Sequence, residues 1–303
     1  MIIRPRPHGW QLLYILRGSI VPAVAPKVLV ILLLAVAASA FIGRHPLGSG
    51  GQAVVPFTLL GLVLSVFLSF RNNACHDRWW EGRRQWGQLT VESRGLARQC
   101  QALLADDPAL QRRVSRLAAG FAHALAARLR GRDETAAAAP WLDADAAQTF
   151  ERRNIPDGLL TRIACELAVP LRAGRLDTYQ YGLFEARLQA MASVQAACER
   201  IAGTPLPFAY TLLLHRCAWL FCVLLPFGLA GALGWATPVV SAVLAYAFFG
   251  LDRLGEEMEE PFGLQPNDLP LDALVRTIEI DLLDALGERP LPEPLQPRDY
   301  VLQ

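Results

Sequence analysis

The chain has 303 residues, of which 53% are hydrophobic and 19% are charged, and its formal net charge is +1. A soluble domain rarely combines so much hydrophobic content with so little charge, so the composition favours an integral membrane protein. The arginines are dispersed rather than gathered into one patch, which argues against nucleic acid as a partner.

The N-terminal region contains the first candidate membrane segment. Residues 1–22 mix apolar and charged side chains, which predicts a short amphipathic helix at the membrane surface, or else an ordinary lead-in to the first span. The apolar residues 28–42, with 21–26 added, are long enough for a first transmembrane helix. The glycines and proline within 45–51 then predict a turn.

The second span is the stretch on which the function depends most. No residue from 45 to 70 carries a formal charge, so a helix placed at 54–80 can cross a bilayer with length to spare. Within it, Leu62, Val66 and Phe70 recur at every fourth residue and share one helical stripe. Periodicity alone favours packing of this stripe against lipid or neighbouring helices.

Residues 81–203 are too charged and too rich in helical periodicity to lie in lipid, which predicts a soluble helical region. Its expected elements are helices at 108–129, at 157–173 with an interruption at Pro170, and at 177–202, and an exposed loop at 133–139.

Two further spans are predicted within residues 204–251. The segment 217–251 carries no charge over about 35 residues, which is too long for one span and slightly short for two with a turn. The third span must therefore begin before Arg216, at about 206–228, and the fourth covers about 238–251. Arg216 would then reach the interface or pair within the bundle.

Four spans place both ends of the chain on the same side of the membrane. The arginine-rich segments 71–98 and 187–200 flank the membrane on that side, and the positive-inside rule makes it the cytoplasm. Residues 252–303 are expected to form an acidic block, a cytoplasmic helix at 271–286 and a proline-rich tail.

Two blocks of sequence closely resemble one known family, the bestrophins. Residues 69–87 read SFRNNACHDRWWEGRRQWG, like the family's signature in which a membrane helix runs into an Arg- and Trp-rich segment. Residues 250–272 read GLDRLGEEMEEPFGLQPNDLPLD, like the acidic block after its last membrane helix, with Glu260 in place of the Asn of Asn-Pro-Phe-Gly. The resemblance implies an all-α protein with four transmembrane helices and a large helical cytoplasmic region, assembled as a homopentamer in a bacterial inner membrane.

The resemblance also implies roles for particular residues. It places Leu62, Val66 and Phe70 in the narrow neck of a pore, to which five subunits contribute one helix each, and an apolar ring of this kind can gate by dewetting. It places a second, cytoplasmic constriction near Leu188. Animal members hold calcium with an acidic run of which only Asp268 remains here, so we expect no metal site.

Ion selectivity is predicted from the carboxylates after the fourth span, namely Asp252, Glu256, Glu257, Glu259 and Glu260. If some of them face the vestibule rather than bond to arginines, they concentrate cations. Bacterial bestrophins resemble cation channels whereas animal ones conduct anions, so we expect monovalent cations to be the permeant ions. The opposing feature is the arginine-rich segment 71–98, and a chloride channel is the alternative.

Two other classes of function were weighed. A membrane-embedded enzyme would have only the clustered glutamates 256–260 as acids or ligands, and a membrane scaffold would need no site. The chain has no catalytic motif, and its six cysteines lack the spacing of a zinc site, so we expect no cofactor. The polar residues 69–80 are expected to be a structural belt at the membrane interface, although Asn72 and Asn73 could meet hydrated ions.

Overall fold

The structure is a computed structural model that describes residues 1–4, 8–10, 14–16, 18–44, 54–143 and 152–303. The regular elements of these residues are helices, apart from isolated bridges that pair Val301 with Ile2 and Arg298. The chain divides into two compact units. We call residues 4–79 with 205–260 the apolar unit, and residues 1–3, 80–204 and 261–303 the polar unit.

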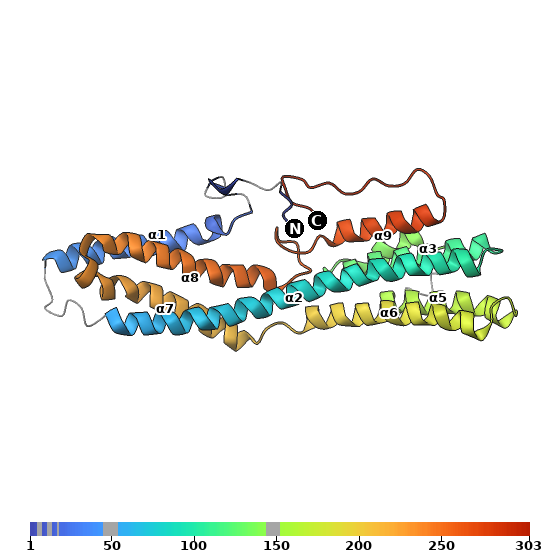
Figure 1. Cartoon of the computed structure of the whole chain (residues 1–303), viewed down its shortest axis with the longest axis horizontal. Coiled ribbons are helices and arrows are strands. Elements are labelled where there is room, and N and C mark those ends of the chain that lie inside the picture. The colour runs from blue at the N-terminus through green and yellow to red at the C-terminus, as the bar shows by residue number, and fades with distance from the viewer. Residues whose placement is uncertain (5–7, 11–13, 17, 45–53, 144–151) are drawn as a thin grey trace. The chain divides into compact units, whose positions relative to one another are not determined.

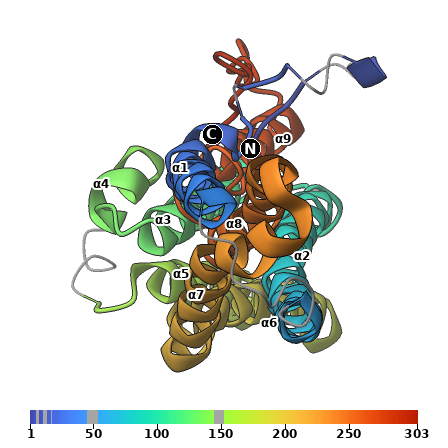
Figure 2. The same cartoon turned by 90° about the vertical axis from the view of Figure 1, so that its left-hand side faces the viewer.

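The apolar unit contains α1 (Val21–Arg44), the first half of α2 (Val54–Leu103), α7 (Phe208–Leu233), the short helix η4 (Gly234–Ala236) and α8 (Thr237–Glu259). Helix α8 packs on α1 and α7, and the three lie side by side in both views (Figure 1 and Figure 2). Their shared core includes Ile31, Leu68, Phe221 and Phe249. Because α1, α7 and α8 are apolar around most of their surface, the core is only part of the hydrophobic area that they carry.

Three stretches are long and apolar enough to cross a membrane, by length and composition: Val21–Ile42, Val55–Leu103 and Phe208–Glu259. The third stretch contains both α7 and α8, which are joined by a turn that begins at Gly234. This glycine has a φ of 51°, in the left-handed region that other residues avoid. The four predicted spans thus correspond to α1, α2, α7 and α8, although α7 and α8 are longer than the predicted 206–228 and 238–251.

The polar unit contains the second half of α2, α3 (Pro108–Leu129), α4 (Glu134–Ala138), η2 (Ala139–Trp141), α5 (Ile155–Arg172), α6 (Thr178–Gly203) and α9 (Leu271–Ala285). Helix α3 packs on α5 and α9 through its buried face. Side-chain caps begin four of these helices: Asp107 accepts a hydrogen bond from the Leu110 N–H, Asp133 from Thr135 and Ala136, Asn154 from Asp157, and Asp177 from Gln180.

Three local predictions were wrong. Helix α2 does not end near Trp80 but continues to Leu103, because buried side chains such as Trp86 and Leu96 maintain its apolar face. Pro170 does not interrupt its helix, because α5 runs continuously from Ile155 to Arg172. The interfacial helix expected within residues 1–22 stays a prediction, since only part of that stretch is described; there, Ile3 donates its N–H to the Tyr300 carbonyl at 2.9 Å. The predicted loop at 133–139 holds α4, which Asp133 caps. The predicted turn at 45–51 lies outside the described residues.

Candidate functional site

The membrane segment of α2 has one face that packs against its own bundle. This face repeats with helical spacing and consists of Leu64, Leu68, Arg71 and Cys75, each at most 4% exposed. Leu64 and Leu68 belong to the core that α7 and α8 also form. Gly61 lets α2 approach α7 closely, since a Cβ there would meet the Phe221 ring at 3.1 Å.

Leu62, Val66 and Phe70 lie on the opposite side of α2, about 170° around the helix axis from the buried face at 3.6 residues per turn. Their exposed fractions are 62%, 44% and 62%. Their own protomer leaves them uncovered, so they must face lipid, another copy of the chain or an ion path. Exposure alone does not decide among these, because Leu59 and Val63 are exposed as well. A pore-lining role stays a prediction.

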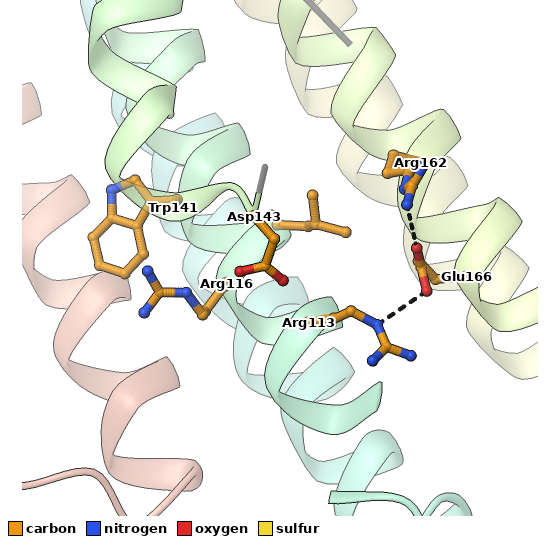
Figure 3. Close-up of a pocket in the computed structure, with 7 residues that line it drawn as sticks. Arg113, Arg116, Trp141, Asp143, Arg162 and Glu166 are labelled. Atoms are coloured by element: carbon orange, nitrogen blue, oxygen red, sulfur yellow. Dashed lines mark hydrogen bonds and ion pairs between the residues drawn. The ribbon is translucent and has the colours of Figure 1, made fainter. Parts of the chain in front are cut away.

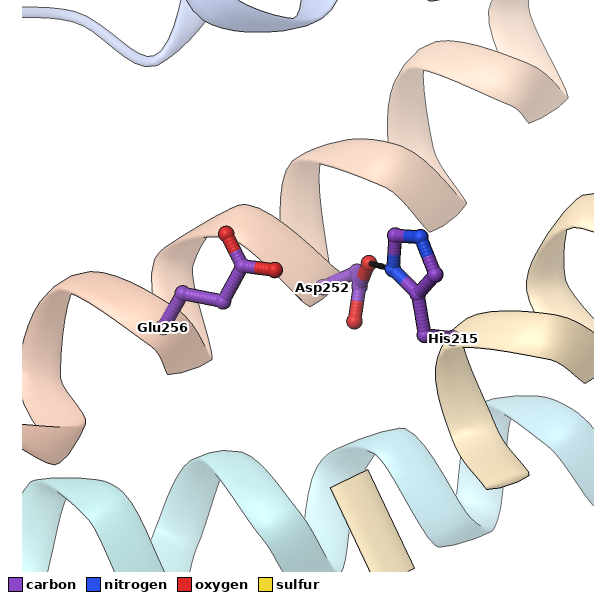
Figure 4. A group of neighbouring side chains, drawn as sticks. All are labelled: His215, Asp252 and Glu256. Carbon is purple, nitrogen blue, oxygen red and sulfur yellow. Dashed lines mark hydrogen bonds and ion pairs between the residues drawn. The ribbon is translucent and has the colours of Figure 1, made fainter. Parts of the chain in front are cut away.

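A buried charged cluster begins at the residue after Phe70. Arg71 is fully buried and donates to the Asp252 carboxylate at 2.6 Å, and the other carboxylate oxygen lies 2.7 Å from His215 Nδ1. Figure 4 shows Asp252 on α8 turned toward His215 on α7. One carboxylate therefore joins α2, α7 and α8, and it compensates a guanidinium that stays charged even when buried.

The same region was tested as a metal site. His215, Asp252 and Glu256 each offer a ligand atom, and these atoms lie within 4.8 Å of one another. Both oxygens of Asp252 are already bonded, however, and a divalent cation would lie against the buried Arg71. Glu256, one turn along α8 in Figure 4, holds Arg253 at 3.0 Å. The arrangement is an internal ion-pair network rather than a metal centre.

The selectivity prediction requires that some of the carboxylates after the fourth span face the vestibule rather than bond to arginines, and most of them lie beside arginines. Asp252 is 1% exposed and bonded to Arg71. Glu256 and Glu257 both bond to Arg253, at 3.0 and 3.1 Å. Glu259 lies 3.7 Å from Arg71, whereas Glu260 is exposed at the end of α8. Four of the five carboxylates thus lie beside two arginines, Arg71 and Arg253, and a vestibule role for Glu260 stays a prediction.

Leu188, the candidate for the second constriction, is only 5% exposed. It lies on the buried face of α6 with Phe184 and Met191, whereas Glu185 and Gln189 are exposed. A residue that narrows a shared path must reach the protomer surface, so the structure gives Leu188 the role of a core side chain and offers no support for a constriction there.

A small pocket lies between α3, η2 and α5 in the polar unit and is lined by three arginines (Figure 3). Glu166 already bonds to Arg113 and Arg162, and Arg116 donates to the Pro140 carbonyl and lies over the Trp141 ring. The cavity holds about 50 Å³, room for a water molecule or two. It is therefore too small and too well paired for a substrate-sized ligand.

Sequence reasoning missed the Arg71, Asp252 and His215 cluster. The available signal was an arginine directly after one apolar run and an aspartate directly after another, because ionised groups near a bilayer core need partners. That signal predicts pairing but not which residues pair, since Arg71 and Asp252 are 181 residues apart.

Comparisons with known proteins identify the family to which this fold belongs. The chain matches the family described as "Bacterial/Fungal Bestrophin protein" over residues 1–284. It is 46% identical over 290 residues to a voltage-dependent anion channel-forming protein of Mesorhizobium japonicum, covering 96% of this chain and 94% of the relative. A relative of the same name in Escherichia coli K12 is 38% identical over 304 residues, with both chains fully covered.

Solved structures extend the match to three dimensions. A bacterial bestrophin homolog from Klebsiella pneumoniae superposes with a TM-score of 0.83 at 36% identity, covering 88% of this chain and all of that chain. The fold is thus an all-helical membrane fold with long apolar helices. The chain belongs to the bacterial bestrophin family. Because this is a family of channel-forming proteins, the enzyme alternative is excluded.

Proposed function

We propose that the chain is the pore-forming subunit of a homopentameric channel for monovalent ions in a bacterial inner membrane, with both ends in the cytoplasm. The observation that carries the proposal is the bare stripe of Leu62, Val66 and Phe70, opposite the face by which α2 packs on its own bundle. One protomer offers a single such stripe, so several copies are needed to surround a path. Membrane lipid covers the remaining apolar surface.

The stripe supplies a gate and the buried cluster supplies its support. A ring of Leu62, Val66 and Phe70 offers a permeating ion no polar ligand, so a narrow ring is dry and closed and a slightly wider one conducts. Arg71 follows Phe70 directly and is bonded through Asp252 to two other helices. Neck width is therefore coupled to the packing of α2, α7 and α8.

Anions are the permeant ions that the relatives favour. The curated relatives are named voltage-dependent anion channel-forming proteins, and the pairing of Asp252, Glu256 and Glu257 with arginines weakens the reason for expecting cations. We therefore assign monovalent anions such as chloride. Cations remain a second candidate, favoured by one exposed carboxylate, Asp77, on the same helix as the neck.

The deciding experiment uses the purified full-length chain in a planar bilayer under a sodium chloride gradient. A reversal potential near the chloride equilibrium potential supports the anion assignment, and one near the sodium potential replaces it with the cation candidate. The mass of the detergent-solubilised protein tests assembly in parallel. A folded monomer that carries no current would overturn the channel itself.

A further inference from the structure

Asp77 differs from the acidic residues near the membrane that arginines hold, such as Asp252 and Glu256. It is the only acidic residue in the first 80 positions of the chain. Its side chain is 85% exposed, and the partner nearest to it is the neighbouring His76, with Nδ1 and Oδ1 3.9 Å apart and the imidazole itself 59% exposed. By contrast, Asp252 and Glu256 are held by arginines. Asp77 therefore presents an uncompensated charge.

The position of Asp77 on α2 places this charge on one particular side of the helix. Asp77 lies seven residues after Phe70, or two turns, so the helix returns it to the side that carries Leu62 and Val66. Asn73, which is also exposed, lies between them on the same side. Along α2, this side of the helix thus changes from apolar to polar and then to acidic. Asp77 lies about 10 Å along the helix axis from Phe70.

We infer that Asp77 limits the preference of the channel for anions over cations, because its carboxylates, one from each subunit, form an acidic ring beside the neck; the inference rests on the proposed function. An ion that passes within a Debye length of about 8 Å experiences this charge directly. Coulomb's law in water then changes the local ion concentration by about twofold per carboxylate, upward for cations and downward for anions. Asp77 thus has a role in ion selectivity, rather than the structural role at the membrane interface that its sequence context predicts.

The first test neutralises this residue. In Asp77→Asn the ratio of chloride to sodium permeability, measured from reversal potentials in bilayers, is expected to rise at least about twofold. Asp77→Glu retains the charge and is expected to restore the wild-type ratio. The matched control, Asp106→Asn, removes an exposed carboxylate from the turn after α2 and is expected to change nothing.

The outcomes separate this inference from the channel proposal. An unshifted ratio in Asp77→Asn, in a protein that conducts, overturns the role of Asp77 and leaves the channel standing. A wild-type protein that carries no current overturns both.

The second test measures whether the position lies on the ion path. Of the native cysteines, Cys165 is exposed and Cys217 partly exposed, whereas the other four are buried. Asp77→Cys is therefore made together with Cys165→Ser and Cys217→Ser, and treated with thiol reagents of opposite charge. The anionic reagent is expected to lower chloride permeability and the cationic one to raise it. Complete labelling, confirmed by mass spectrometry, without any change in current would overturn the inference.

Discussion

The two faces of the membrane segment of α2 divide stability from function. One face includes Arg71 and is buried against α7 and α8, whereas the other carries Leu62, Val66 and Phe70, which are 62%, 44% and 62% exposed in their own protomer. Side chains that contribute little to packing within the protomer are constrained mainly by what they contact outside it, which is lipid, neighbouring subunits or ions. The comparison thus predicts that substitutions on the two faces will have different consequences.

The largest effect is expected where the buried face loses its counter-charge. Asp252→Ala leaves Arg71 charged and buried with Glu259, 3.7 Å away, as its remaining counter-charge, which costs about 3–5 kcal/mol and lowers the midpoint of unfolding in detergent. Replacing both partners, as in Arg71→Met with Asp252→Leu, is expected to recover much of this loss because no isolated charge remains. A loss below about 1 kcal/mol in Asp252→Ala would show that water reaches the guanidinium.

The second prediction compares the faces directly. Replacing Leu62, Val66 and Phe70 together with Ala is expected to widen and wet the neck, raising single-channel current while leaving the stability of the protomer nearly unchanged. The matched controls are Leu64→Ala and Leu68→Ala, which create cavities in the bundle and are expected to cost about 2–5 kcal/mol each. If the triple variant has wild-type conductance, the stripe faces lipid or a neighbour rather than ions.

The sequence predicted the elements better than their pairings. The helix at 108–129 and the first span were placed correctly because a cap or a long apolar run marks them locally. The pairing of Arg253 with Glu256 and Glu257 was also readable, since residues three and four apart are neighbours on a helix. The prediction of cation selectivity did not take this pairing into account.

Other features of the structure cannot be predicted from local sequence patterns. Asp252 binds an arginine 181 residues away, and the N-terminal strand pairs with residues near 301, so both depend on the tertiary fold. Leu188 illustrates the same limit, because helical periodicity cannot say whether an apolar face meets its own unit or an ion path.

A smaller effect is expected in the polar unit, where stability comes from caps and packing of amphipathic helices. The Leu110 N–H and the Arg175 guanidinium hold the pKa of Asp107 below its ordinary value of 3.8. Asp107→Ala is expected to cost about 1 kcal/mol at neutral pH. Because the folded state lowers this pKa, the contribution is present above the unfolded value and is lost as pH falls through the folded one. The difference in stability between Asp107→Ala and wild type should therefore begin to shrink only as pH falls below about 4 and should vanish below the lowered folded-state pKa, whereas Asp106→Ala, with an exposed side chain, should match wild type throughout.

The smallest expected effect is that of calcium on channel current. It tests whether the carboxylates in the segment after α8 bond only to protein groups and not to a metal ion. Asp268 is 3% exposed and accepts the Gln265 N–H at 2.6 Å, and Asp272 is paired with Arg130 and Arg132. Calcium requires six to eight oxygen ligands, several of them carboxylates, and these two are already occupied by donors. Channel current should therefore not change between chelator and micromolar calcium. A steep activation curve would mean that calcium displaces Arg130 from Asp272, and Arg130→Ala should then sensitise the channel further by freeing that carboxylate.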